Sequence, residues 1–269
     1  MLGFFAALLL SQPGFAALRV VVMNVGQGQA ILLVQGSNGV LIDSGMAPFA
    51  EQLLARIDAH GVASLDYFIL THLHPDHAGG FFRVRERHPN AVVIGNGHPL
   101  AERIQPFMVN LYNDALLGAP NQRTMRAGDA LAWRGVTIEA LWPDSYANQN
   151  LNRHSLVLEI THGRSRALIM GDTGASVERL LLERHAIEGP FSLLVSGHHG
   201  MAGSADANFL ARVRPRVAVI SANWKTTKLQ PSDAVTARLK AASGRFLRTD
   251  EDGEICLELA AESGSVEDC

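Results

Sequence analysis

The amino-acid sequence predicts an α/β (α+β) fold in which helices cover stacked sheets. Short apolar runs typical of buried strands recur along the chain, and amphipathic helical segments follow many of them. The two halves of the chain repeat this order. With 269 residues, of which 47% are hydrophobic, the chain is long enough for a sizeable core. No linker separates the halves, so a single domain is expected.

Two strands open the first half, in the stretch 18–36, and the sequence VGQGQ joins them through a glycine-rich turn. A helix predicted over 48–61 has its apolar residues on one face and ends at Gly61. The remaining elements of this half are strands at 39–45, 65–72 and 91–95 and a helix at 79–89.

Residues 98–128 are the least regular part of the chain, with a broken helix predicted around Pro106. Beyond them the sequence predicts two hairpins, one over 129–143 and one over 154–172 that turns at His162–Gly163. The remaining elements are helices at 175–185, 205–215 and 231–244 and strands at 191–196, 216–221, 245–249 and 254–260.

The N-terminus predicts a signal peptide over residues 1–17, followed by one domain over 18–269. An apolar block at residues 2–10 is too short to span a bilayer, and small residues follow it up to Ala16 and Ala17. The block carries no preceding Lys or Arg, so a misassigned start or the remnant of a transmembrane segment are the alternatives. We favour export, to the periplasm or the medium, and expect no membrane span in the mature chain.

The charge pattern argues against a stable nucleic-acid complex. The formal net charge is -3 and no run of Lys or Arg stands out, although a nucleic acid could still be a transient substrate held by metal ions. The two cysteines, Cys256 and Cys269, have no metal-like spacing. We favour a strand cysteine and a free C-terminal thiol, with a disulfide as the alternative.

Polar residues that can bind metals gather where predicted strands end, most densely in the stretch THLHPDHAGG at 71–80. Strand ends meet at one edge of a sheet, so these side chains could converge. The candidates are Asp43, His72, His74, Asp76, His77, Asp172, His198 and His199. Five other histidines are expected at the surface or at helix ends, namely His60, His88, His98, His162 and His185.

The local spacing suggests separate roles within this cluster. His72 and His74 point the same way along an extended chain and can hold one ion, while Asp76 and His77 turn toward a neighbouring ion. Asp172 could bridge both ions, although taken alone it could be an ordinary turn residue, as could the sequence GHHG at 197–200. Asp43 is expected to accept a histidine N–H and fix its tautomer.

The stretch 71–80 resembles the H-x-H-x-D-H motif of the metallo-β-lactamase superfamily. The sequences VGQGQAILL, LIDSG, NRHSLVLEI, IMGD, SGHHG and QPSDAV make the chain similar to the C-terminal domain of ComEC-type competence proteins. The resemblance implies a four-layer αββα sandwich with two divalent ions, Zn²⁺ before Mn²⁺. It implies as ligands His72, His74, Asp76, His77, Asp172 and one of His198 and His199. We favour His199, because the superfamily's last ligand commonly precedes a glycine or an acidic residue.

The resemblance also bears on catalysis. It makes Asp76 and His198 the catalytic candidates, with His198 facing the substrate. The superfamily's third histidine has no clear match, and its place falls near Asn152, His154 and Ser155.

Some positions depart from the ComEC-type pattern. Asn24 and Gln29 stand where carboxylates are usual, and Gln230 stands where a histidine precedes Pro-Ser, which puts nuclease activity in doubt. His74 stands where Asp is frequent, which makes the site a more ordinary hydrolase site.

These observations predict an exported hydrolase that uses a metal-bound hydroxide to cleave a phosphodiester, in a nucleic acid or a small molecule. A carbonyl hydrolase acting on a lactone, thioester or β-lactam is the first alternative, because a fold does not choose the substrate. A non-catalytic, metal-stabilised module of a competence or envelope system is the second. The sequence predicts no oligomeric state.

Overall fold

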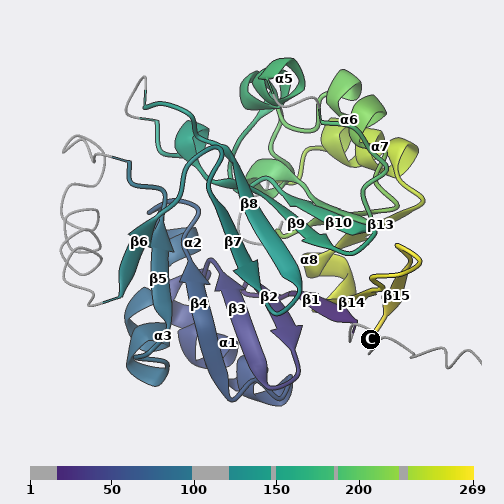
Figure 1. The fold of residues 1–269 in the computed structure, drawn as a ribbon. Coiled ribbons are helices and arrows are strands. Elements are labelled where there is room, and N and C mark those ends of the chain that lie inside the picture. Colours follow the sequence, from purple (N-terminus) through teal and green to yellow (C-terminus); the bar gives the residue numbers. More distant parts are fainter. Residues whose placement is uncertain (1–16, 99–120, 147–149, 185–186, 224–229) are drawn as a thin grey trace, which may run out of the picture.

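The computed structural model describes residues 17–98, 121–146, 150–184, 187–223 and 230–269 (Figure 1). Within them the chain forms two mixed sheets. The first has the strand order β15-β14-β1-β2-β3-β4-β5-β6 and the second the order β13-β12-β11-β10-β9-β8-β7.

The first sheet comprises β1 (Leu18–Val22), β2 (Ile31–Gln35), β3 (Asn38–Ile42), β4 (Ser64–Ile69), β5 (Val92–Gly95), β6 (Gln122–Thr124), β14 (Ile255–Leu259) and β15 (Val266–Asp268). The second comprises β7 (Ala130–Trp133), β8 (Val136–Trp142), β9 (Val157–His162), β10 (Ser165–Ile169), β11 (Leu193–Val195), β12 (Val217–Ile220) and β13 (Arg245–Arg248).

The helices are α1 (Ala50–Ala59), α2 (Pro75–Ala78), α3 (Phe81–Arg87), α5 (Ala175–Arg184), α6 (Ala207–Val213), α7 (Asp233–Ala242) and α8 (Thr249–Asp252), with short 3₁₀ turns η1 (Ala47–Phe49), η2 (Asn152–His154) and η3 (Gly197–Gly200). The helices expected over 48–61, 79–89, 175–185, 205–215 and 231–244 each correspond to one of these.

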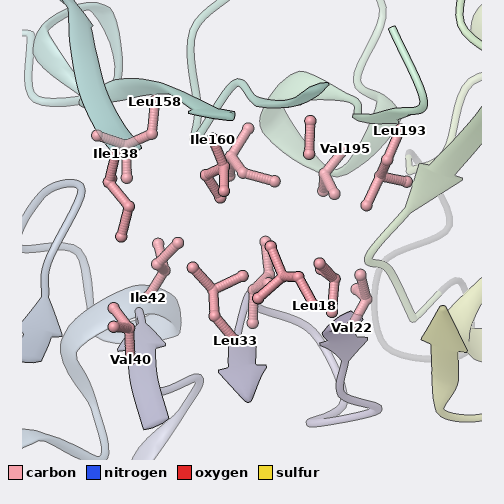
Figure 2. Packing of buried hydrophobic residues seen from close by; sticks show 14 of the residues in the cluster. Leu18, Val22, Leu33, Val40, Ile42, Ile138, Leu158, Ile160, Leu193 and Val195 are labelled. Atoms are coloured by element: carbon pink, nitrogen blue, oxygen red, sulfur yellow. The ribbon is translucent and has the colours of Figure 1, made fainter. Parts of the chain in front are cut away.

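The predicted four-layer sandwich is confirmed by where the apolar side chains lie. One cluster fills the space between the two sheets, where Leu33 and Ile42 of the first sheet face Ile138 and Ile160 of the second (Figure 2). A second cluster joins the outer face of the first sheet to α1 and α3, and a third joins the second sheet to α5, α6 and α7. Strands covered on both faces are apolar throughout, which explains their unbroken apolar runs.

The strand connections bring one kind of strand end together. β3, β4 and β5 run parallel, as do β10, β11, β12 and β13. Parallel neighbours need crossover connections, which α1, α3, α5, α6 and α7 supply. Their carboxyl ends therefore lie along one edge of each sheet, and the loops that follow them can meet.

The sequence analysis did not predict two of the strands. β6 lies inside the stretch 98–128 expected to be irregular, and β15 lies near the C-terminus. Each has three residues without apolar alternation, so pairing with β5 and β14 defines them rather than local pattern. The broken helix expected around Pro106, like the signal peptide up to residue 16, lies outside the described residues. Among the helices that are described, none is long and apolar enough to cross a membrane.

The expectation of a free C-terminal thiol was wrong. Cys256 and Cys269 form a disulfide with a Cα–Cα distance of 5.5 Å. The antiparallel pairing of β14 with β15 places the chain end beside Cys256, and the Cys269 amide donates to the Cys256 carbonyl.

The isolated histidines were only partly anticipated. His60 and His88 follow the last turns of α1 and α3, as expected of helix-end residues, although His88 is buried. The surface prediction was wrong for His98 and His162, which are buried. The segment after β14 packs on the turn beyond His162, and the His98 ring lies 4.7 Å from that of His154. His185 lies outside the described residues.

Candidate metal centre

Four loops that follow parallel strands carry the polar cluster. Asp43 directly follows β3, and the stretch from His72 to His77 follows β4. Asp172 lies just past β10, and η3, with its two histidines, lies just past β11. The centre is thus built from the carboxyl ends of strands in both sheets, the edge predicted from the sequence.

The side chains form two groups of potential metal ligands. Within each group the donor atoms lie within 4.8 Å of one another. One group consists of His72, His74 and Asp172, and the other of Asp76, His77, Asp172 and His199. Asp172 belongs to both.

The two carboxylate oxygens of Asp172 face different groups. Its Oδ1 lies 3.0 Å from His77 Nε2 and 3.4 Å from His199 Nε2. Its Oδ2 lies 3.7 Å from His72 Nε2. Asp172 Oδ1 is also buried without a hydrogen bond of good geometry among the described residues, although a histidine nitrogen lies near it. A carboxylate in this position fits two neighbouring cations.

The backbone is specialised to present these donors. His74 is extended, Pro75 then starts α2, and Asp76 and His77 lie within this single turn. The β1–β2 loop supports the turn, because the backbone N–H of Gln29 donates a hydrogen bond to the Asp76 carbonyl over 3.0 Å. A Cβ on Gly28, whose φ is +140°, would lie 2.3 Å from the same carbonyl oxygen, so glycine is required there.

Hydrogen bonds on the far side of each imidazole fix its orientation. His77 Nδ1 donates to Asp43 Oδ2 over 2.7 Å, and His199 Nδ1 donates to the Ser221 carbonyl over 2.8 Å. His72 Nδ1 lies 3.1 Å from Ser155 Oγ. Each Nε2 is therefore left facing the centre, the arrangement that metal-binding histidines use.

The protonation of the histidines differs between the two groups. Burial lowers the pKa of His72 well below its ordinary value and also lowers the pKa of His74. Burial alone would raise the pKa of Asp172, but nearby His77 and His199 outweigh it and hold that pKa well below its ordinary value. The pKa of His77 is raised well above its ordinary value and that of His199 is also raised, because nearby carboxylates outweigh their burial. Metals bind neutral imidazoles and ionised carboxylates, so a cation in the second group would displace the protons of these two rings.

The remaining candidates surround the two groups. His198 Nε2 lies 3.8 Å from Asp172 Oδ2 and 3.2 Å from Asn152 Nδ2, and His198 belongs to neither group. Its side chain is 24% exposed, against 3% for His199. Ser155 Oγ accepts the Asp172 amide, whereas the His154 ring packs against His98 outside both groups.

Three supporting residues were not recognised in their roles from the sequence. Thr71 donates its amide and its hydroxyl to the Asp43 carboxylate, and Gln29 donates to Asp43 Oδ2 over 2.8 Å. Adjacency to His72 could have pointed to Thr71. No local signal points to Ser221, because only the packing of β12 beside β11 brings its carbonyl to His199.

Comparison with known proteins identifies the family of the chain. The family model described as the metallo-beta-lactamase superfamily matches residues 23–223. The chain therefore belongs to that superfamily, which places it among metal-dependent hydrolases.

Two curated relatives indicate a narrower group of similar proteins within the superfamily. The chain is 30% identical to "Competence protein ComA" of Neisseria gonorrhoeae, over 88% of this chain and 31% of the relative. It is also 30% identical to "Recombination protein 2" of Haemophilus influenzae, over 93% of this chain and 30% of the relative. The chain thus spans about a third of the length of these relatives. The crystal structure of YhfI from Bacillus subtilis, titled a metallo-beta-lactamase fold protein, shares the fold with a TM-score of 0.53 at 14% identity, covering 87% of this chain and 96% of that one.

Proposed function

We propose that this protein is an exported hydrolase that holds two divalent ions and cleaves phosphodiester bonds. One observation carries the di-metal part of the proposal: the two oxygens of Asp172 each face a separate group of imidazole and carboxylate donors. Two ions sharing a carboxylate make a water nucleophilic near neutral pH and neutralise charge on the attacked group. Imidazole-rich donors suit Zn²⁺ first, with Mn²⁺ as the alternative.

The chain's own residues have distinct proposed roles. His72 and His74 hold one ion with Asp172, and Asp76, His77 and His199 hold the other with the same carboxylate. His198 contacts the substrate and carries a proton, a role supported by its partial exposure and its place beside both groups. Asp76, which lies 3.4 Å from His199 Nε2, orients the reacting groups at the second ion.

The names of the relatives support a phosphodiester as the substrate. One is a competence protein and the other a recombination protein, so both names refer to processes that involve DNA. The net charge of -3 favours transient contact with such a substrate over a stable complex. Gln230, which replaces the usual histidine, is hydrogen-bonded to Gln27 over 2.6 Å, so its amide is engaged within the protein.

The disulfide supports export. Disulfides persist in oxidising compartments such as the periplasm and are rare in the reducing cytosol. The bond between Cys256 and Cys269 therefore agrees with the apolar leader-like stretch at residues 2–10.

The direct test combines metal analysis with three substrates. The purified protein is analysed for bound metal and assayed on bis(p-nitrophenyl) phosphate, single-stranded DNA and nitrocefin, with and without added Zn²⁺ or Mn²⁺. We expect about two ions per chain and turnover of the phosphodiesters. Turnover of nitrocefin alone would make the protein a carbonyl hydrolase, and two ions without turnover of any substrate would favour a non-catalytic module.

Removing one ligand tests the assignment of the site. We expect His74→Ala to lose bound metal and to lower kcat by about 100-fold or more, the scale of losing one electrostatic stabiliser. The fold should persist, because His74 lies in a loop and not in a sheet. His60→Ala, at the end of α1 and outside both donor groups, is the matched control and should keep both metal and activity. Full activity of metal-replete His74→Ala would refute the assignment.

A further inference from the structure

Arg153 is a positively charged residue beside the metal centre. It follows Asn152 in the turn η2, and Asn152 Nδ2 lies 3.2 Å from His198 Nε2. Arg153 is half-buried, and among the described residues no carboxylate forms an ion pair with it. Partial burial takes water away from a charge, which favours a counterion beside it. Arg153 is therefore suited to bind an anion that comes from outside the chain.

The position of Arg153 is fixed by its backbone and by its side chain. Its carbonyl accepts a hydrogen bond from Trp142 Nε1 over 2.6 Å, and its N–H donates to Asn150 Oδ1 over 2.9 Å. Its guanidinium carbon lies 5.9 Å from the centre of the Trp142 ring, and its Nη1 donates to Ser176 Oγ over 2.9 Å. A guanidinium has several N–H donors, and the hydrogen bond to Ser176 occupies one of them. A donor group that is held in place before binding loses less conformational entropy when an anion binds.

The same contacts place the guanidinium next to the centre. Ser176 lies in α5, the helix that begins shortly after Asp172, and the Arg153 side chain joins this helix to η2. Asp172 belongs to both donor groups, and η2 adjoins His198 through Asn152. Arg153 thus connects two elements that each contain or adjoin a residue of the centre.

We propose that Arg153 binds a phosphate of the substrate other than the one that is cleaved. The inference rests on the proposed function and adds a residue that distinguishes a substrate with several phosphates from a substrate with one. The planar guanidinium can donate two parallel hydrogen bonds to one phosphate group. A single contact of this kind, on a chain of net charge -3, agrees with transient binding of a nucleic acid.

Binding of an oligonucleotide that is not cleaved tests the contact. A fluorescein-labelled oligothymidylate is titrated with the full chain in EDTA, and its anisotropy is measured at several NaCl concentrations for the wild type, Arg153→Gln and Arg153→Lys. We expect Arg153→Gln to raise Kd about 10-fold, the scale of one charge-assisted hydrogen bond. The slope of log Kd against the logarithm of salt concentration should fall by about 0.7, the value for one phosphate contact on a single strand. Arg153→Lys keeps the charge and should retain most of this slope.

Arg216→Gln is the matched control, because it also removes one positive charge. Arg216 directly precedes β12, at the amino end of the strand whose carboxyl end leads to Ser221 and the centre. Its Kd and salt dependence should stay at the wild-type values. Equal effects of Arg216→Gln and Arg153→Gln would show that total charge accounts for binding, which overturns the proposal. Equal titrations of Arg153→Gln and the wild type, including no measurable binding by either, would overturn it as well.

Turnover separates this inference from the proposed function. Arg153→Gln should lower kcat/KM on single-stranded DNA about 10-fold more than on bis(p-nitrophenyl) phosphate, which has one phosphate. An equal fall on both substrates would place Arg153 at the cleaved phosphate and contradict the proposal. A metal-loaded wild type that shows the Arg153-dependent binding but cleaves neither substrate would refute the proposed hydrolase and leave the phosphate contact supported.

Discussion

At the scale of single residues, Asp43 shows how much of the centre depends on groups that face no ion. Its carboxylate is fully buried, and its backbone has a φ of 59°. It accepts hydrogen bonds from the Thr71 amide, the Thr71 hydroxyl, Gln29 Nε2 and His77 Nδ1. A buried charge is tolerated because these four donors surround it. Asp43 thereby links the β4 end, the β1–β2 loop and one metal-facing imidazole.

Asp43→Asn tests this link. The substitution keeps the shape but removes the charge that holds the His77 proton at Nδ1, so Nε2 is no longer fixed as the metal-facing nitrogen. We expect metal affinity to fall by about 10- to 100-fold, the range for such supporting partners. Asp66→Asn, which also loses carboxylate hydrogen bonds but lies at Trp133 and Arg134, should leave metal affinity unchanged. Equal Zn²⁺ titrations for Asp43→Asn and the wild type would contradict the role.

At the scale of elements, α5 stabilises the segment that follows the second histidine loop. Glu178 on α5 is buried and accepts hydrogen bonds of 2.7 Å from the amides of Ala205 and Asp206, which lie just before α6. Burial raises the pKa of Glu178 to about 7, although the two amides oppose that shift. The contact between α5 and the segment before α6 therefore contains a carboxyl group, that of Glu178, which is more easily protonated in the folded chain than in the unfolded one.

This difference predicts a pH dependence of stability. The folded pKa lies above the ordinary value of 4.5, so the contribution of Glu178 is fully present below pH 4.5 and is lost as the pH rises through about 7. Compared with Glu178→Gln, the wild type should lose about 3 kcal/mol of unfolding free energy across that range, as an order of magnitude. Urea unfolding of both proteins at several pH values measures it. Glu183→Gln, an exposed position on the same helix, should follow the wild type, and parallel profiles for Glu178→Gln and the wild type would refute the prediction.

At the scale of the whole molecule, the two ends of the described chain meet in one sheet. β1 pairs with β14 along its full length, from Leu18 opposite Leu259 to Val22 opposite Ile255. The first sheet is therefore complete only when the last part of the chain pairs with β1. The disulfide between Cys256 and Cys269 adds a covalent tie between β14 and the chain end.

Removing the disulfide should weaken the fold without changing the metal centre. The bond closes a loop with a sequence separation of 13 residues, so the double variant Cys256→Ser, Cys269→Ser should lose about 3 kcal/mol of unfolding free energy by the chain-entropy model. Urea unfolding with and without dithiothreitol measures this loss, and the double variant should not respond to the reductant. Metal content should stay at the wild-type value, because neither cysteine belongs to the donor groups. If dithiothreitol did not change the unfolding free energy of the wild type, that result would contradict the disulfide.

Local pattern accounts for much of the fold. The hairpin at His162–Gly163 and the helices α1, α5 and α7 follow from apolar periodicity and turn residues, because these act over a few neighbouring positions. The short strands β6 and β15 do not, because their definition depends on partners distant in the chain or on the chain end. Local pattern did not predict the burial of His98 and His162 for the same reason.

For the candidate site, the sequence by itself determined which side chains are available as metal ligands. His72, His74, Asp76 and His77 lie within six residues, so any fold that exposes this loop at a strand end brings them together. Only the tertiary structure decided how residues from the other sheet join them. It places His199 rather than His198 in a donor group, and it brings Asn152 to His198 and Cys269 to Cys256. Such choices depend on side-chain directions and on packing between distant segments, which local sequence patterns do not specify.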